Sequence, residues 1–244
     1  ARIFALELAD FPTGFPSVVM IERLLWDSAF FDMPVGRAFL SDCNSDGVAV
    51  VLDEAKTVGF KLVYLFSETE LLGLESDLFD GKVVFSYDLS VKDACLELCE
   101  EVNEACEELY LLAFRSGEHS RFLADKRIGE GNFRRMYSLW VDNSVSGAFA
   151  DKVFVYKIDG KIVGFVTLSL NGLSADIGLI AVDAVYGGRG IGTKLIESCK
   201  RAAFDRGATV LNVATQNDNM QACSFYSKNG FIRSKVTYIY HLWF

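Results

Sequence analysis

The sequence lacks any apolar run near the roughly 20 residues that a membrane-spanning helix requires. The beginning of the chain also lacks the basic segment and the long apolar segment of a secretory signal. With 51% hydrophobic residues in a chain of 244, there is still enough apolar surface for one large domain or two smaller ones. We therefore expect a cytoplasmic globular protein without a membrane partner.

Basic residues are scarce relative to acidic ones. Lysine and arginine number 24 against 33 aspartates and glutamates, which gives a net charge of -9 at pH 7. Such a charge removes the long-range attraction on which nonspecific nucleic-acid binding depends, so nucleic acid is not an expected partner. A small anionic ligand remains compatible, because helix N-termini bind phosphates locally.

The six cysteines show no paired Cys-x-x-Cys spacing, which argues against a zinc or redox motif. Cys95, Cys99 and Cys106 instead recur at spacings of four and seven together with Val102, which predicts an apolar stripe on a helix. Free cysteine is among the most buried residue types. We expect ordinary core thiols and no metal.

The order of predicted elements indicates two parts, an N-terminal α/β accessory unit over 1–80 and a second domain over 81–244. The first part combines strands at 17–25, 35–40 and 61–66 with a helix at 48–58. The second begins with a strand at 82–89 and helices at 91–113 and 132–143, and continues with strands at 152–157, 161–170 and 175–182, a helix at 191–206, a strand at 209–214, a helix at 220–229 and a strand at 232–242. The dipeptides Asp159-Gly160 and Asn171-Gly172 are typical of hairpin turns.

A glycine-rich loop precedes the helix at 191–206. Gly187, Gly188, Gly190 and Gly192 allow backbone N–H groups to approach a phosphate closely, and the helix N-terminus adds a partial positive charge. The order Thr193-Lys194 excludes a Walker A loop, and Leu195 stands where a dinucleotide fingerprint needs its third glycine. A glycine-rich turn without a ligand is the alternative.

This loop resembles the motif Gln/Arg-x-x-Gly-x-Gly/Ala of the GNAT superfamily of N-acetyltransferases. Gly190 and Gly192 match it, Arg189 matches its common Arg-Gly-x-Gly form, and Gly187 stands where the family usually has Gln or Arg. The resemblance implies a GNAT fold of the α/β (α+β) class and a site for acetyl-CoA as co-substrate. It assigns the thioester to the backbone of Ile180, Ala181 and Val182, and the pyrophosphate to Gly187, Gly188, Arg189, Gly190, Ile191, Gly192 and Thr193.

A second segment, from Asn219 to Phe231, resembles the Asn-x-x-Ala-x-x-x-Tyr-x-x-x-Gly-Phe signature of the same family. The resemblance implies that Asn219 contacts the coenzyme and that Tyr226 gives a proton to the departing sulfur. A phenol is protonated at neutral pH and can play this catalytic role. The alternative is an aromatic side chain that anchors the last helix.

Several shorter segments, at 26–31, 120–122, 137–143 and 214–216, resemble bacterial GNAT enzymes that acetylate dTDP-linked amino sugars. The aromatic Trp26 and Phe31 on a loop beside Asp27 suit a base or sugar ring, and Arg121 suits a nucleotide phosphate. The alternative for the aromatic residues is packing. Arg134 and Arg135 are weaker candidates for the phosphate.

The resemblance predicts transfer of acetyl to the amine of a nucleotide sugar, most specifically dTDP-4-amino-4,6-dideoxygalactose. Acetylation of another small amine, or acyl-CoA sensing without turnover, are the alternatives. The base that takes the amine's proton stays open between Glu118, His119, Asp176 and a chain of waters. The apolar last strand could pair with a second subunit in a homodimer.

Overall fold

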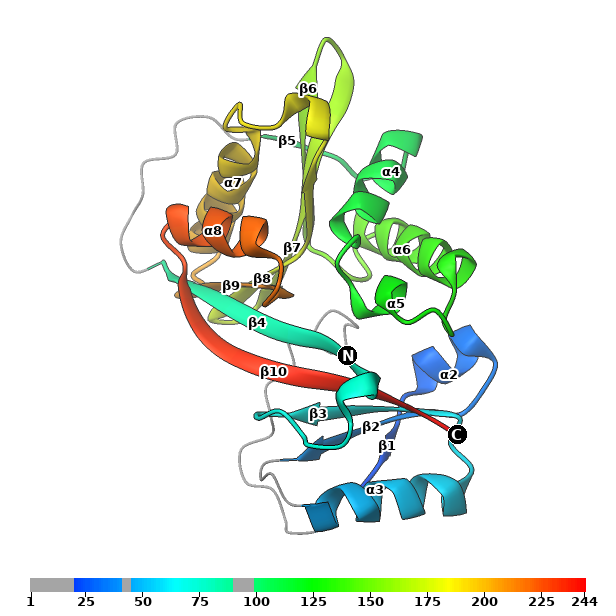
Figure 1. Ribbon diagram of the computed structural model, residues 1–244. Helices are drawn as coiled ribbons and strands as arrows, with labels where there is room; N and C mark the ends of the chain where they lie inside the picture. Colours follow the sequence, from blue (N-terminus) through cyan, green and yellow to red (C-terminus); the bar gives the residue numbers. More distant parts are fainter. Residues whose placement is uncertain (1–19, 41–44, 90–98) are drawn as a thin grey trace. The chain divides into compact units, whose positions relative to one another are not determined.

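The computed structural model describes residues 20–40, 45–89 and 99–244 (Figure 1). The larger of two compact units holds the described residues of Val84–Thr215 together with Asn219–Ser234. The smaller unit holds those up to Val83, with Gln216–Asp218 and Lys235–Phe244. The division into domains at residue 80 stays a prediction, and these units differ from it in assigning the end of the chain to the smaller unit.

The smaller unit is built on the strand order β1-β2-β3-β10. Strands β2 (Val35–Leu40) and β3 (Leu62–Ser67) are parallel and are joined by helix α3 (Ser45–Val58), whereas β10 (Ile232–Trp243) runs antiparallel to β3. Every residue of β3 is buried, as is typical of an inner strand of a parallel sheet. The core of this unit lies between the sheet and α3, where Val51 and Ala55 pack against Leu40 and Leu65.

One prediction in the smaller unit is wrong. Residues 17–19 of the strand expected at 17–25 lie outside the described residues, β1 covers Glu22–Arg23, and Leu25–Phe31 forms helix α2. The expected loop around Trp26 is therefore helical. Trp26 and Phe30 are four residues apart, so a helix brings their rings together, and they stack with centroids 5.1 Å apart.

The sheet of the larger unit follows the order β4-β9-β8-β7-β6-β5. Strands β6 (Lys152–Ile158), β7 (Lys161–Asn171) and β8 (Ser174–Val182) form the predicted antiparallel meander. Asp159 and Gly160 have φ of 50° and 80°, the left-handed values that a two-residue hairpin turn requires. The remaining strands are β4 (Leu78–Asp88), β5 (Glu100–Glu101) and β9 (Val210–Gln216).

Helices lie on both sides of this meander (Figure 1). One side carries α7 (Ile191–Asp205), which is the crossover between the parallel strands β8 and β9, and α8 (Met220–Lys228). The other side carries α4 (Glu107–Ser116), α5 (Arg121–Ala124) and α6 (Glu130–Val145). The predicted face of α7 is confirmed, since Ile191, Leu195, Ile196 and Cys199 are buried.

The continuous helix predicted over 91–113 is wrong in its middle. Cys95 lies outside the described residues, Glu100 and Glu101 form strand β5 against β6, and α4 begins only at Glu107. Ion pairs favour the strand, because Lys152 and Lys157 of β6 bind Glu101 and Glu100 at 2.5 and 2.7 Å. The predicted helical cysteine stripe is therefore not formed by Cys99 and Cys106.

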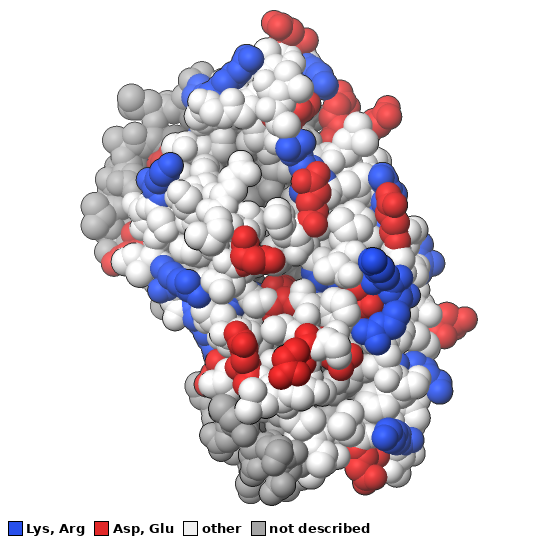
Figure 2. Space-filling model, viewed as in Figure 1, with Lys and Arg blue, Asp and Glu red and all other residues white. Residues whose placement is uncertain are grey.

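None of the described helices is long and apolar enough to cross a membrane. Acidic and basic side chains are interspersed over the described part of the face seen in Figure 2.

Candidate active site

A β-bulge in β8 shifts its register against β7. Val166 of β7 faces Ile180, but Leu168 faces Ile177, so Gly178 and Leu179 together lie opposite Thr167. Pairing of β8 with β9 extends from Ser174 to Ile177. Beyond that point, within the described residues, the β9-facing backbone groups of β8 have no strand partner. They are available to hydrogen-bond an extended ligand.

The freed end of β8 lines a cavity of about 550 Å³, called here the first cavity. Its walls come from β8, the glycine-rich loop, α8 and the segment after α4. The residues that line it are Arg115, Ser116, Glu118, His119, Ile180, Ala181, Val182, Ala184, Tyr186, Gly187, Gly188, Gly190, Ile191, Gly192, Thr193, Asn219, Gln221, Ala222, Phe225 and Tyr226.

The glycine-rich loop is fixed at both ends. A carboxylate oxygen of Asp183 accepts a hydrogen bond from the N–H of Val185 at 3.1 Å, and α7 begins directly after Gly190. Gly188 and Gly190 have φ of 74° and 75°, a backbone conformation that strains other residues. The first N–H groups of α7 therefore lie at the cavity wall, where an anion can bind them.

Tyr226 is buried on α8, with its ring among Phe85, Phe225 and Phe231 at centroid distances of 5.4 to 5.9 Å. Its hydroxyl makes no hydrogen bond within the described part of the chain, and the residue lines the first cavity. Burial raises the pKa of Tyr226 well above its ordinary value. The phenol is therefore protonated at neutral pH.

Asn219 is the N-cap residue of α8 and also lines the first cavity. Its side-chain oxygen accepts a hydrogen bond from the N–H of Ala222 at 3.0 Å, which caps the helix. Because the oxygen is occupied in this way, the amide nitrogen is the group that can contact a ligand.

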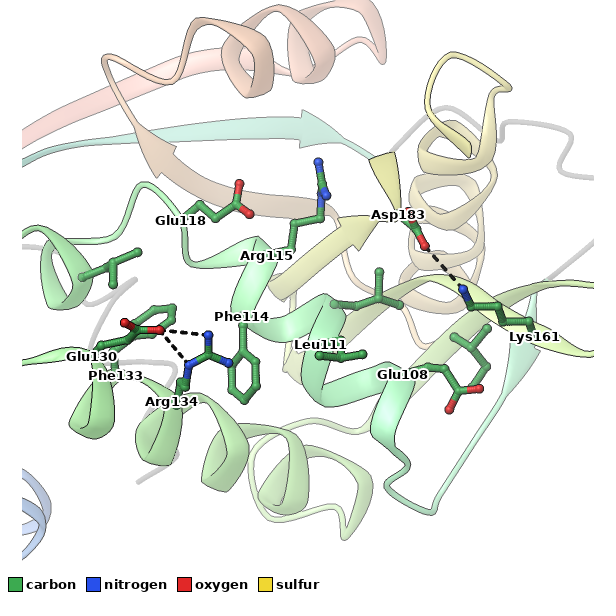
Figure 3. Close-up of a pocket in the computed structure, with 13 residues that line it drawn as sticks. Glu108, Leu111, Phe114, Arg115, Glu118, Glu130, Phe133, Arg134, Lys161 and Asp183 are labelled. Carbon is green, nitrogen blue, oxygen red and sulfur yellow. Dashed lines mark hydrogen bonds and ion pairs between the residues drawn. The ribbon is translucent and has the colours of Figure 1, made fainter. Parts of the chain in front are cut away.

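A second cavity, of about 400 Å³, adjoins the first (Figure 3). It lies between α4, α6 and the start of β7, and the two cavities share Arg115 and Glu118. Two ion pairs lie in its wall, Glu130–Arg134 at 2.9 Å and Lys161–Asp183 at 3.7 Å. The apolar lining consists of Leu111, Leu112, Phe114, Leu123, Phe133 and Ile162.

The structure brings together all but one of the residues predicted to bind the coenzyme. Arg189 is the exception, since it is exposed, is not among the lining residues, and holds its guanidinium 5.2 Å from the centroid of the Tyr186 ring. Its neighbours Gly188 and Gly190 line the cavity, whereas the Arg189 side chain is exposed and packs on the Tyr186 ring.

The residues predicted to bind the acceptor belong to different units and line neither cavity. Trp26, Asp27 and Phe31 lie on α2 of the smaller unit, with Asp27 buried. Arg121 opens α5 of the larger unit, is buried, and holds its guanidinium 4.1 Å from the centroid of the Phe122 ring. An acceptor site formed by these residues stays a prediction.

Several lining residues were not predicted from the sequence. Arg115 and Ser116 carry no motif, and their position depends on where α4 ends. Phe225 lies in the segment from Asn219 to Phe231, but the family resemblance assigns it no role. Its position beside the ligand loop follows from the close approach of Gly192, where an added Cβ would lie 3.0 Å from the Phe225 ring.

A model of the acetyltransferase (GNAT) family matches residues 103–231, just over half of the chain. The chain therefore belongs to the GNAT family. It is an N-acetyltransferase, and so an acyltransferase, with the GNAT fold.

Among curated relatives, the chain is 26% identical over 228 residues to the dTDP-fucosamine acetyltransferase of Escherichia coli O6:H1. That match covers 88% of this chain and 94% of the relative. An uncharacterized N-acetyltransferase of Methanocaldococcus jannaschii is 32% identical over 136 residues, which are 53% of this chain and 56% of the relative.

Two solved structures show the likeness in fold. A functionally unknown conserved protein from Staphylococcus epidermidis superposes with a TM-score of 0.61 over 96% of both chains, at 8% identity. A putative GNAT acetyltransferase from Novosphingobium aromaticivorans gives a TM-score of 0.50 at 12% identity, covering 74% of this chain and 73% of the other.

Proposed function

We propose that this enzyme transfers an acetyl group from acetyl-CoA to the amine of a nucleotide-linked amino sugar, with dTDP-4-amino-4,6-dideoxygalactose as the leading acceptor. The observation that carries the acetyl-CoA part is the first cavity. There the end of β8 that has no β9 partner among the described residues, the N-terminus of α7 and Tyr226 line one space.

The residues of this cavity fit the chemical parts of acetyl-CoA. The coenzyme's extended amide-containing arm suits the backbone groups of Ile180–Val182 that face away from β7, because these can complete a strand-like ladder with it. Its pyrophosphate suits the N–H groups of Gly188–Thr193, which offer hydrogen bonds and a helix terminus without a Cβ in the way at Gly188 and Gly190.

When bound, acetyl-CoA supplies the acetyl thioester. Tyr226 would donate its phenolic proton to the leaving sulfur, on which negative charge develops as the carbon–sulfur bond breaks. Backbone N–H groups of Ile180, Ala181 and Val182, beyond the β8 bulge, would polarise the thioester carbonyl.

The nucleotide-sugar acceptor is supported by the E. coli relative, a dTDP-fucosamine acetyltransferase whose similarity covers 88% of this chain. We propose Trp26, Asp27, Phe31 and Arg121 as residues that contact this acceptor. Their residue types suit stacking, hydroxyl binding and phosphate binding.

The acceptor assignment can be tested by product analysis. The purified chain is incubated with acetyl-CoA and with dTDP-4-amino-4,6-dideoxygalactose, spermidine, phenethylamine or free amino acids, and acetylated products are quantified by mass spectrometry. We expect the highest kcat/KM for the nucleotide sugar. Faster turnover of another amine would replace the acceptor, and binding of acetyl-CoA without any acetylated product would contradict the catalytic proposal.

A further inference from the structure

We propose that Glu118 takes the proton from the attacking amine, and that the sugar ring that bears this amine occupies the second cavity. This inference rests on the proposed acetyl transfer. It assigns the catalytic base of that reaction and the cavity from which the acceptor amine approaches the thioester.

Glu118 lies at the border of the two cavities. It follows α4, and only Glu118 and Arg115 line both the coenzyme side and the second cavity among the described residues. In Figure 3 the side chains of these two residues project from the same end of α4. A carboxylate at this border can reach a nitrogen atom that comes from the second cavity toward the thioester side.

The carboxylate of Glu118 is also available. Within the described residues it makes no ion pair and no hydrogen bond, so its oxygens can accept a proton. Of the other carboxylates in the second cavity, Glu130 binds Arg134 at 2.9 Å and Asp183 accepts a hydrogen bond from the N–H of Val185. Glu108 makes no ion pair with described residues, but it does not line the first cavity.

The other bases considered from the sequence are placed less well. Asp176 lines neither cavity, and its carboxylate accepts hydrogen bonds from Asn171 at 2.9 Å and Asn212 at 3.2 Å. His119 lines the first cavity but not the second, so it does not border the proposed path of the amine. The ionisable groups that share the two cavities with Glu118 are Glu108, Arg115, His119, Glu130, Arg134, Lys161, Asp183, Tyr186 and Tyr226.

The second cavity suits an uncharged and partly apolar group, such as a sugar ring. Its two ion pairs neutralise four of its charged side chains, and the rest of its wall is mostly leucine, isoleucine and phenylalanine. The Arg134 guanidinium lies over the Phe114 ring, 5.0 Å from its centroid, which is a cation–π contact. The Phe114 ring adds a flat apolar surface to the wall of the cavity. A deoxysugar ring, with its methyl group and few hydroxyls, has this character.

The proposed transfer balances in atoms and protons. The amine nitrogen forms a bond to the acetyl carbon as the carbon–sulfur bond breaks. Glu118 receives the proton that the nitrogen loses, and Tyr226 gives its proton to the sulfur. Exchange with water then removes the proton from Glu118 and restores that of Tyr226.

The test compares Glu118→Gln with Glu107→Gln and His119→Gln in the full chain. Glu107 is the matched control, because it is an exposed carboxylate of α4 that lines neither cavity and makes no ion pair with described residues. The acceptor is the most rapidly acetylated amine of the panel above. We expect Glu118→Gln to lower kcat/KM for that amine about 100-fold at neutral pH. Glu107→Gln should stay within about threefold of wild type, and acetyl-CoA binding by calorimetry should not change in either variant.

The pH profile separates a base from a merely structural residue. At alkaline pH the amine loses its proton to water without help, so the deficit of Glu118→Gln should shrink as pH rises. Equal activity of Glu118→Gln and wild type would overturn the inference, as would a deficit that is independent of pH or a larger loss in His119→Gln. If the wild-type chain acetylates no amine of the panel, the proposed function fails as well, so the two failures are distinguishable.

Discussion

The side-chain oxygen of Thr167 accepts a hydrogen bond from the backbone N–H of Leu179 at 2.8 Å. Both residues are buried, and this bond lies inside the bulge where β8 leaves β9. A single hydroxyl on β7 thus holds the part of β8 that the coenzyme is proposed to bind.

Replacing Thr167 by Val removes the acceptor and keeps the shape of the side chain. The unpaired N–H of Leu179 should lower the free energy of unfolding by about 1–3 kcal/mol, and acetyl-CoA affinity should fall because the bulge loses its support. Ser169→Ala is the control, since Ser169 lies on the same strand, is buried and donates to the carbonyl of Phe149 at 2.8 Å, away from the bulge. Equal acetyl-CoA affinities in the two variants, by calorimetry, would contradict this role.

Gly190→Ala places a methyl group at the wall of the first cavity. The added strain at φ of 75° is of the order of 1–2 kcal/mol, and the methyl group should weaken acetyl-CoA binding at least about tenfold. Gly160→Ala introduces similar strain, at φ of 80°, in a hairpin turn far along the sequence from the loop. Only the first variant should lose affinity. Comparable losses in both would mean that strain, and not the loop, determines binding.

Tyr226→Phe keeps the buried ring and removes the proton. We expect turnover to fall by roughly 10²–10⁴ while acetyl-CoA binding changes little. Because burial raises the pKa of Tyr226, the wild-type enzyme should keep its protonated donor up to and beyond the ordinary tyrosine pKa of 10.0. If kcat instead falls with a midpoint below pH 10 while acetyl-CoA binding is unaffected, a group other than Tyr226 is responsible for the loss of activity at alkaline pH.

Arg121→Ala tests the proposed phosphate contact of the acceptor. Loss of a charge-assisted hydrogen bond should raise the acceptor KM by a factor that corresponds to about 1.5–3 kcal/mol, with the acetyl-CoA KM within a few fold of wild type. Because Arg121 is buried, the unfolding midpoint of the variant must be measured alongside. An unchanged acceptor KM in a folded variant would remove Arg121 from the acceptor site.

Tyr110 of α4 donates a hydrogen bond to Asp142 of α6 at 2.6 Å. This bond, together with partial burial, raises the pKa of Tyr110 to about 12. Since the folded pKa exceeds the ordinary value of 10.0, the stabilisation is present below pH 10 and is lost as pH rises toward 12. Tyr110→Phe should therefore lower the free energy of unfolding at neutral pH, by no more than about 1 kcal/mol after solvent screening. Urea titrations should show this difference vanishing at alkaline pH, and a difference that grows with pH would contradict the assignment.

Local patterns in the sequence were sufficient for most of the larger unit. The meander, its Asp159-Gly160 turn, the apolar face of α7 and the glycine-rich loop depend on neighbours within a few residues, and all were predicted. The resemblance to the GNAT family was likewise carried by two short segments, and the family match confirms it.

The remaining features depended on contacts between residues distant in the chain. The strand at Glu100–Glu101 exists through pairing with β6 about 50 residues later, whereas helical periodicity alone favoured a helix. The end of α4 and the segment after it bring Arg115 and Glu118 to the cavity border, and no motif marks either residue. The sequence by itself therefore determined the glycine-rich loop and the Tyr226 segment, because these patterns are local. Only the tertiary structure decided which carboxylate lies at the border of the two cavities, because that depends on how elements distant in the sequence pack together.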